Sequence, residues 1–282
     1  MNRPIRLAIS TCPNDTFTFH GLMNRKVDWR GLDFHIELLD IQQLNTRAFQ
    51  GDLDIAKVSF HAALLLSDQM VVLPSGSALG FGVGPLLLSA KEDDCPTDST
   101  QLTLCPGIHT TATLLFKLFH PNTARIEQVV FSEIMPHLKN QRADFGVCIH
   151  EGRFTWKSEG LYLVEDLGTR WEAETHCPLP LGGIVGSRLL GHETLVVVQA
   201  VIQDSLNYAL ANRKETLTTM RRYAQEFDDA VMMQHVNLYV NDWTFDLGPV
   251  GKTALDELSD RAQKIGLIPM RSKKLEVLSL TQ

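Results

Sequence analysis

His150 has the surroundings expected of a residue that transfers protons. It follows the apolar run FGVCI and precedes Glu151 and Arg153, so its imidazole is expected at the mouth of a cleft with charged neighbours. A histidine whose pKa stays near its ordinary value of about 6.5 can act as a general base at neutral pH. A hydrogen-bonded structural histidine is the alternative, and position in the sequence alone does not decide between the two.

Lys57 and Ser59 occupy alternate positions of a second apolar run, IAKVS, so their side chains project to the same side of a predicted strand. A lysine in an apolar run is costly to bury without a partner. This predicts that an anionic ligand group or a local carboxylate lies beside Lys57. A surface ion pair between Asp54 and Lys57 is the alternative, whereas for Ser59 we favour a contact with the ligand.

Thr110, Thr111 and Ala112 stand at the predicted start of a helix, after a Pro-Gly pair and before the apolar pattern TLLFKLF. Hydroxyls and unpaired N–H groups at a helix N-terminus bind anions. An ordinary threonine cap is the alternative, and the two roles can coexist. Asn14 and Asp15 follow the first strand of the chain, where one or the other is expected to cap the next predicted helix, and they are a further pair of candidates.

The remaining motifs argue against metals and cofactors. The five cysteines include no C-x-x-C pair, so neither a zinc site nor a disulfide framework is predicted. Cys12 alone stands out, because it begins a loop. The run GSALGFGVGP lacks the spacing of a dinucleotide fingerprint and is interpreted as a backbone bend near the cleft, and Walker A, H-E-x-x-H and G-x-S-x-G patterns are missing. We therefore expect no metal and no cofactor.

The elements that must position these residues are repeated along the chain. A strand, turn and helix unit at RLAIS, TCPND and TFTFHGLM has a counterpart at LTLC, PGIHTT and ATLLFKLF, about 90 residues later. The segments GDLDIAKVS and RADFGVCIH are separated by a similar interval. Two similar α/β lobes, each with a largely parallel sheet, are therefore predicted. In open α/β sheets ligands bind beyond the carboxyl ends of the strands, where the candidate residues stand.

The last part of the chain changes character. From residue 194 onward helical patterns dominate, and such a tail is expected to pack on the first lobe. We predict a discontinuous first lobe of residues 1–88 plus 180–282 and a second lobe of residues 89–179. Crossings are expected near residues 88–100 and 175–182, the first of them through the polar segment KEDDCPTDSTQ.

Composition narrows the range of partners. The 282 residues are 44% hydrophobic and carry a net charge of −7, with scattered basic residues, so nucleic acid is not an expected partner. The apolar runs are shorter than the roughly 20 residues of a membrane span, and the N-terminal stretch is too short for a secretory signal. We predict a cytoplasmic protein without membrane insertion that acts on a small carboxylate substrate. A homodimer is compatible with these features.

Six segments together resemble one enzyme family, the 1,4-dihydroxy-6-naphthoate synthases: TCPNDTF, AKVSFHA, SGSALGFGVGPL, GIHTTATLLF, CIHEGRFTW and PLPLGGIV. They extend in the same order over nearly the whole chain. The resemblance implies a two-lobed, periplasmic-binding-protein-like (type II) fold with a ligand cleft between the lobes. It also implies a cofactor-free lyase that converts cyclic dehypoxanthinylfutalosine to 1,4-dihydroxy-6-naphthoate in the futalosine route to menaquinone.

The resemblance also implies roles for individual residues. The histidine of the I-H-E segment, His150, corresponds to the proton acceptor of the family. The K-x-S segment and the H-T-T-A helix start contact substrate in the family, which carries that role to Lys57, Ser59, Thr110, Thr111 and Ala112. Chorismate dehydratase of the same pathway and a non-catalytic solute-binding protein are the alternatives. A regulator's effector domain would need a DNA-binding module, and none is visible.

Overall fold

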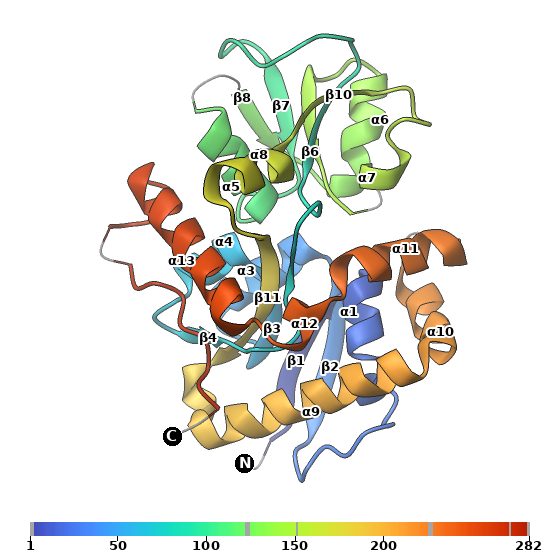
Figure 1. Cartoon of the computed structure of the whole chain (residues 1–282), viewed down its shortest axis with the longest axis vertical. Coiled ribbons are helices and arrows are strands. Elements are labelled where there is room, and N and C mark those ends of the chain that lie inside the picture. Colours follow the sequence, from blue (N-terminus) through green and yellow to red (C-terminus); the bar gives the residue numbers. More distant parts are fainter. Residues whose placement is uncertain (1–2, 122–124, 151, 225–227, 271, 281–282) are drawn as a thin grey trace.

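The strands of the protein form two sheets, one in each half of an elongated molecule (Figure 1). The structure is a computed structural model that describes residues 3–121, 125–150, 152–224, 228–270 and 272–280. Each sheet has helices of its own (Figure 1). The two-lobed α/β architecture predicted from the sequence is therefore confirmed.

The first sheet contains the N-terminal strands and one strand from late in the chain. Its strands are β1 (Ile5–Ser10), β2 (Phe34–Leu39), β3 (Ile55–Ser59), β4 (Met70–Val72), β5 (Ala78–Gly80) and β11 (Leu179–Ser187). They follow the order β2-β1-β3-β11-β4, and β5 pairs with β11. Because β11 returns from the second lobe to the middle of this sheet, the first lobe is discontinuous in sequence.

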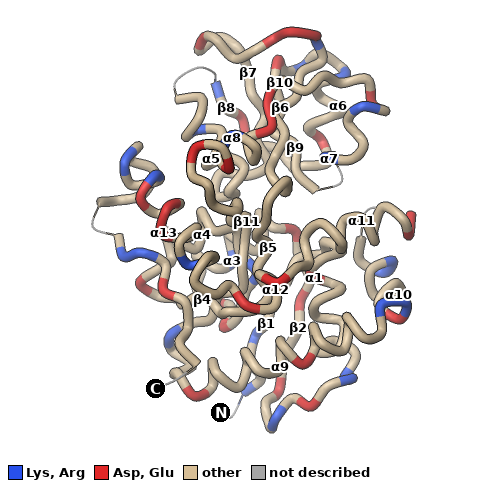
Figure 2. Tube along the Cα trace, viewed as in Figure 1, with Lys and Arg blue, Asp and Glu red and all other residues tan. Residues whose placement is uncertain are grey.

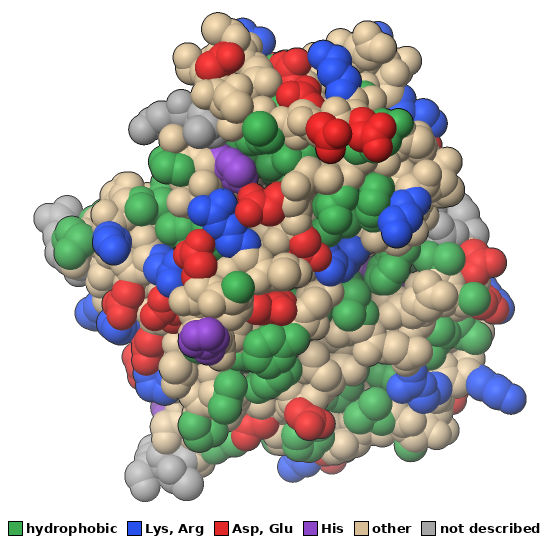
Figure 3. Space-filling view, turned by 45° about the horizontal axis from the view of Figure 1, so that its top comes forward, with side chains coloured by type: hydrophobic (Ala, Val, Ile, Leu, Met, Phe, Trp, Pro, Cys, Tyr) green, Lys and Arg blue, Asp and Glu red, His purple; other side chains and the backbone are tan. Residues whose placement is uncertain are grey.

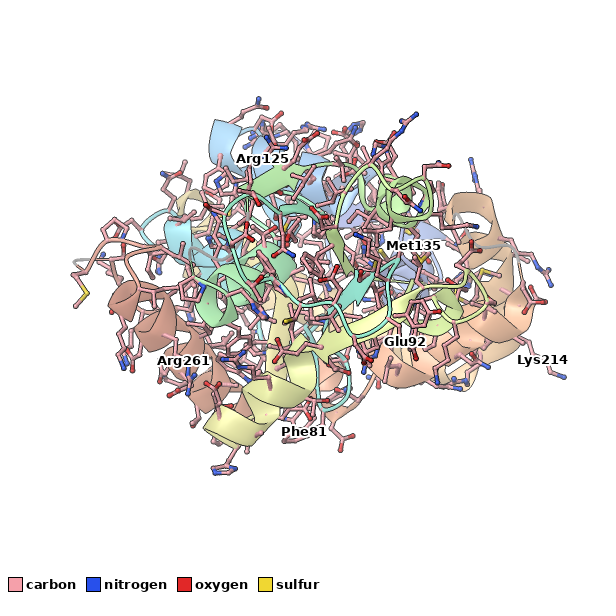
Figure 4. The ribbon with its side chains drawn as sticks, turned by 90° about the horizontal axis from the view of Figure 1, so that it is seen from above. Phe81, Glu92, Arg125, Met135, Lys214 and Arg261 are labelled. Carbon is pink, nitrogen blue, oxygen red and sulfur yellow. The ribbon has the colours of Figure 1, made fainter. Side chains whose placement is uncertain are left out.

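The second sheet is built from the middle of the chain. Its strands are β6 (Leu86–Ser89), β7 (Leu102–Cys105), β8 (Arg125–Gln128), β9 (Phe145–Cys148) and β10 (Tyr162–Asp166), in the order β10-β6-β9-β7-β8. Figure 4 looks down on this lobe, with Glu92 in the β6–β7 loop and Arg125 at the start of β8.

The internal repeat predicted from the sequence is present in the topology. In the first sheet β1 lies between the parallel strands β2 and β3, and in the second sheet β7 lies in the same way between β8 and β9. The strand directions agree with the prediction of largely parallel sheets, with one reversed strand in each sheet. The reversed strand is β11 in the first sheet, antiparallel to β3, β4 and β5, and β6 in the second, antiparallel to β9 and β10.

Short helices follow the strands, and longer ones form the C-terminal part. The helices that follow strands of the first sheet are α1 (Pro13–Thr18), α2 (His20–Met23), α3 (Ile41–Gln50) and α4 (Phe60–Leu65). Those that follow strands of the second sheet are α5 (Thr111–Phe119), α6 (Ile134–Lys139), α7 (Gly152–Thr155) and α8 (Leu167–Thr175). The C-terminal helices are α9 (His192–Ala211), α10 (Arg213–Tyr223), α11 (Asp229–Tyr239), α12 (Asp242–Phe245) and α13 (Gly248–Lys264). They pack on the first lobe, as expected (Figure 1).

The first crossing between the lobes lies earlier than predicted. Because β6 pairs with β9 in the second sheet, the chain crosses in residues 81–85, between β5 and β6. The polar segment at residues 91–101 is instead the loop between β6 and β7. Phe81, at the start of the crossing, is 52% exposed and lies toward the rim of the molecule in Figure 4.

Local sequence signals explain how the elements next to the cleft begin and end. The α3 helix starts with a capping box between Asp40 and Gln43 and ends at Gly51, whose φ of 71° is the left-handed conformation that glycine adopts most easily. Thr110 caps α5 by accepting a hydrogen bond from the Thr113 N–H. Asn14 and Asp15, in contrast, do not cap α1: its N-cap is Cys12, and both side chains turn inward from within the helix.

Candidate active site

One pocket lies between the two lobes, at the carboxyl ends of β1 and β3 from one sheet and beyond β7 and β9 from the other. Helix N-termini and strand ends converge there, as the open α/β arrangement favours. The eight candidate residues predicted from the sequence all line this pocket: Asn14, Asp15, Lys57, Ser59, Thr110, Thr111, Ala112 and His150. Their chemical roles stay predictions.

Lys57 is buried, and its partner is a carboxylate from another element. Its Nζ lies 2.7 Å from Asp15 Oδ1 and donates a second hydrogen bond to the Gly76 carbonyl at 2.9 Å. Both side chains are nearly inaccessible, with 5% and 3% exposed. The alternative of an Asp54–Lys57 surface pair was wrong, because Asp54 pairs with Arg3 and Arg6.

The Asp15 carboxylate accepts hydrogen bonds from three side chains. Besides Lys57, Ser10 Oγ donates to Asp15 Oδ2 at 2.5 Å, and Asn14 Nδ2 donates to Asp15 Oδ1 at 3.0 Å. A buried carboxylate needs such donors to stay ionised. The pair Lys57 and Asp15 therefore brings no net charge to the pocket, and both side chains are fixed by several hydrogen bonds.

His235 extends this chain of hydrogen bonds. Its Nε2 lies 3.0 Å from Asn14 Oδ1, and its ring stands 4.5 Å from that of Tyr239 on the next turn of α11. Burial, with a smaller electrostatic contribution from His150 and Lys57, lowers the pKa of His235 to about 3. The imidazole is therefore neutral at physiological pH.

Ser59 and the N-terminus of α5 form another part of the pocket wall. Ser59 Oγ accepts from Asn45 Nδ2 at 3.1 Å, while the Ser59 N–H donates to Asn45 Oδ1 at 2.9 Å. Thr111 Oγ1 donates to the Leu181 carbonyl at 2.6 Å, which ties α5 to β11. Thr110 is a threonine cap, which is the alternative role expected from the sequence.

His150 comes from the second lobe, two residues after β9. Its φ of 56° is unusual for a residue other than glycine, and such conformations persist where the surroundings hold them. The ring packs edge-on against Phe131 with centroids 4.8 Å apart. Cys12 Sγ, from the first lobe, lies 3.4 Å from His150 Nδ1. A base candidate and a thiol therefore meet across the cleft.

The first crossing forms one wall of the pocket through Val83, Gly84 and Pro85. A side chain at Gly84 would place its Cβ 2.2 Å from the Gly168 Cα. Glycine at both positions therefore allows the two backbone segments to lie in close contact. The interpretation of the glycine-rich run as a bend near the cleft is confirmed. Arg153 braces the same wall, since it donates to the Gly84 carbonyl and to Asp166.

Sequence reasoning missed His235 and Tyr239, which both line the pocket. They stand four positions apart in α11, so they share one helix face. That spacing was visible in the sequence, but nothing in it indicates which helix face meets the cleft.

In the part of the chain that the structure describes, no helix is long and apolar enough to cross a membrane, and no cluster of His, Cys, Asp or Glu could hold a metal ion. Lys and Arg residues are interspersed with Asp and Glu residues along the chain in both lobes (Figure 2). The face in Figure 3 likewise mixes both charges with hydrophobic side chains and shows no continuous basic surface.

Solved structures confirm the fold. A crystal structure of a protein from Archaeoglobus fulgidus matches with a TM-score of 0.89 and 30% identity, over 94% of this chain and 98% of that one. The ligand-binding component of an ABC-type import system from Staphylococcus aureus matches with a TM-score of 0.68 over 95% of this chain and 93% of its own, at 13% identity. The periplasmic aliphatic sulphonate-binding protein of Escherichia coli gives 0.64 at 10% identity, over 96% and 90% of the two chains. The two-lobed binding-protein fold is thus shown.

Sequence comparisons are more specific. A family model described as menaquinone biosynthesis matches residues 5–264. Two curated proteins named 1,4-dihydroxy-6-naphthoate synthase are each 38% identical to this chain. That of Thermus thermophilus matches over 93% of this chain and 95% of its own length, and that of Streptomyces coelicolor over 94% and 95%. The chain therefore belongs to the menaquinone-biosynthesis family that contains the 1,4-dihydroxy-6-naphthoate synthases.

Proposed function

We propose that this protein is a lyase that converts cyclic dehypoxanthinylfutalosine to 1,4-dihydroxy-6-naphthoate in the cytoplasm. The observation that carries the proposal is the meeting of His150 with seven other candidate residues in one interlobe pocket, in a member of this family. Its partner is accordingly a small carboxylate-bearing substrate.

His150 is the proposed general base. Removal of a proton next to a carbonyl group allows the sugar-derived part of the substrate to leave while the bicyclic ring becomes aromatic. Aromatisation supplies driving force, so the reaction as proposed needs no redox cofactor. A base positioned at the reacting carbon contributes typically about 10²–10⁴-fold in rate.

The substrate carboxylate is proposed to bind at the start of α5. The N–H groups of Thr111 and Ala112 lie in the first turn, where the helix offers no backbone acceptor, and the helix dipole favours an anion there. Lys57 is the weaker candidate for this role, because Asp15 and the Gly76 carbonyl already accept hydrogen bonds from its ammonium. We propose that Lys57 instead holds Asp15 and Asn14 against the substrate, beside Ser59.

A direct assay tests this function. Purified protein is incubated with cyclic dehypoxanthinylfutalosine in the presence of a chelator and without nucleotide, and the naphthoate is detected by chromatography. The His150→Asn variant is the control for adventitious activity. Chorismate is supplied in a parallel reaction, because turnover of chorismate alone would reassign the protein to the dehydratase of the same pathway. Tight binding of either compound without conversion would favour a solute-binding protein.

A further inference from the structure

His235 lines the pocket, yet the proposed reaction has so far given it no role. It lies in α11 and is only 4% exposed. Its ring is roughly parallel to that of His150, with an interplanar angle of 27° and centroids 6.2 Å apart. A group bound next to His150 therefore comes close to His235 as well.

The hydrogen-bond chain below the pocket determines which ring nitrogen of His235 carries the proton. The Asp15 carboxylate, held by Lys57, can only accept, so the amide of Asn14 turns its Nδ2 toward Asp15. Asn14 Oδ1 then faces His235 Nε2 at 3.0 Å. Because an amide oxygen can only accept, Nε2 is the protonated nitrogen.

Nδ1 of the neutral ring is consequently an acceptor. Among the residues that the structure describes, no hydrogen-bond donor to Nδ1 is found. The depressed pKa of His235, caused chiefly by burial, makes the ring a poor base, so its use is to orient a donor rather than to remove a proton.

We propose that His235 Nδ1 accepts a hydrogen bond from a hydroxyl group of the substrate and thereby positions the substrate beside His150. The inference rests on the proposed function, and it makes His235 a specificity-determining residue. A ligand with a hydroxyl at this place satisfies Nδ1. One with a carbonyl or ether oxygen there leaves two acceptors facing each other, which costs affinity.

Two replacements of His235 separate its contacts. In His235→Gln the amide nitrogen reaches the former Nε2 position and can still donate to Asn14, but the acceptor at Nδ1 is lost. In His235→Asn the amide oxygen takes the Nδ1 position, whereas the hydrogen bond to Asn14 is lost. Each variant is therefore the matched control of the other.

The measurements are KM and kcat for cyclic dehypoxanthinylfutalosine and the melting temperature of each variant. We expect His235→Gln to melt close to the unmodified protein and to raise KM about tenfold to hundredfold, the loss typical of one missing hydrogen-bond partner. We expect His235→Asn to melt at a lower temperature and to keep KM within about threefold.

The outcomes distinguish this inference from the proposed function. An unchanged KM in His235→Gln, or equal increases of KM in both variants, would overturn the inference alone and would leave His235 as a purely structural residue. If the unmodified protein does not convert the substrate, the proposed function fails and the inference fails with it.

Discussion

Cys12 Sγ lies 3.4 Å from His150 Nδ1, although 138 positions separate the two residues in the sequence. Cys12 follows β1 of the first sheet and His150 follows β9 of the second, so their contact spans the cleft. Both residues line the pocket. A bulky group on the sulfur would therefore occupy space that the substrate and the imidazole need.

Alkylation should make this contact measurable. We expect iodoacetamide to abolish turnover in step with labelling of Cys12, as followed by mass spectrometry, and we expect substrate to slow both. Cys95, exposed in the β6–β7 loop, is the matched control: the Cys95→Ser variant should be inactivated at the same rate. Full turnover by protein whose Cys12 is completely alkylated would show that the thiol stands clear of the substrate.

Replacing His150 tests the proposed base. The His150→Asn variant should lose about 10²–10⁴-fold in single-turnover rate, while its substrate affinity and melting temperature change little. A structural histidine would instead lower stability and affinity together, with a small effect on the chemical step. A rate loss of less than about tenfold in a normally folded variant would move the role of base to another residue, and Asp15 would be tested next.

The buried pair of Lys57 and Asp15 should contribute to stability very differently from an ion pair at the surface. The Lys57→Met variant leaves the Asp15 carboxylate without its ammonium partner in a buried position, so we expect a loss of about 3–5 kcal/mol in the free energy of unfolding. Lys252 pairs with Asp256 on the exposed side of α13. The Lys252→Met variant should lose about 0.3–0.5 kcal/mol in the free energy of unfolding. Denaturant titrations of both variants give the comparison, and similar losses would contradict it.

The repeat in the sequence predicted which strand ends meet at the cleft, because equivalent strands in two similar sheets present equivalent ends. It could not predict partners set by packing between distant elements. Lys57 pairs with Asp15, which is 42 positions away in the sequence, and Asn14 is hydrogen-bonded to His235, which is 221 positions away. The predicted lobe boundary at residue 88 came too late for a related reason: the three leucines of β6 fit the edge or the middle of either sheet equally well.

Two of the buried histidines, His61 and His235, predict how stability depends on pH. Burial lowers the pKa of His61 to about 4 and is the main reason that the pKa of His235 is about 3. In the unfolded chain both groups titrate near 6.5. Between these values the unfolded state binds more protons than the folded state, so stability falls as the pH is lowered from about 6.5. Each group contributes a slope of up to about 1.4 kcal/mol per pH unit.

Variants that keep the hydrogen bonds but cannot titrate isolate this contribution. Nδ1 of His61 donates to the Thr110 carbonyl at 3.3 Å, and the side-chain amide of an asparagine at position 61 can make the same hydrogen bond. The side-chain amide of a glutamine at position 235 can likewise donate to Asn14 Oδ1. The stability of His61→Asn and of His235→Gln relative to the unmodified protein should therefore rise as the pH falls from 6.5 to 4.5, by about 2 kcal/mol each. Denaturant titrations along a pH series measure this difference, with His35→Gln at an exposed position as the control. A difference that stays constant with pH would mean that these histidines become protonated in the folded protein, and the neutral, acceptor form of His235 would then be lost as well.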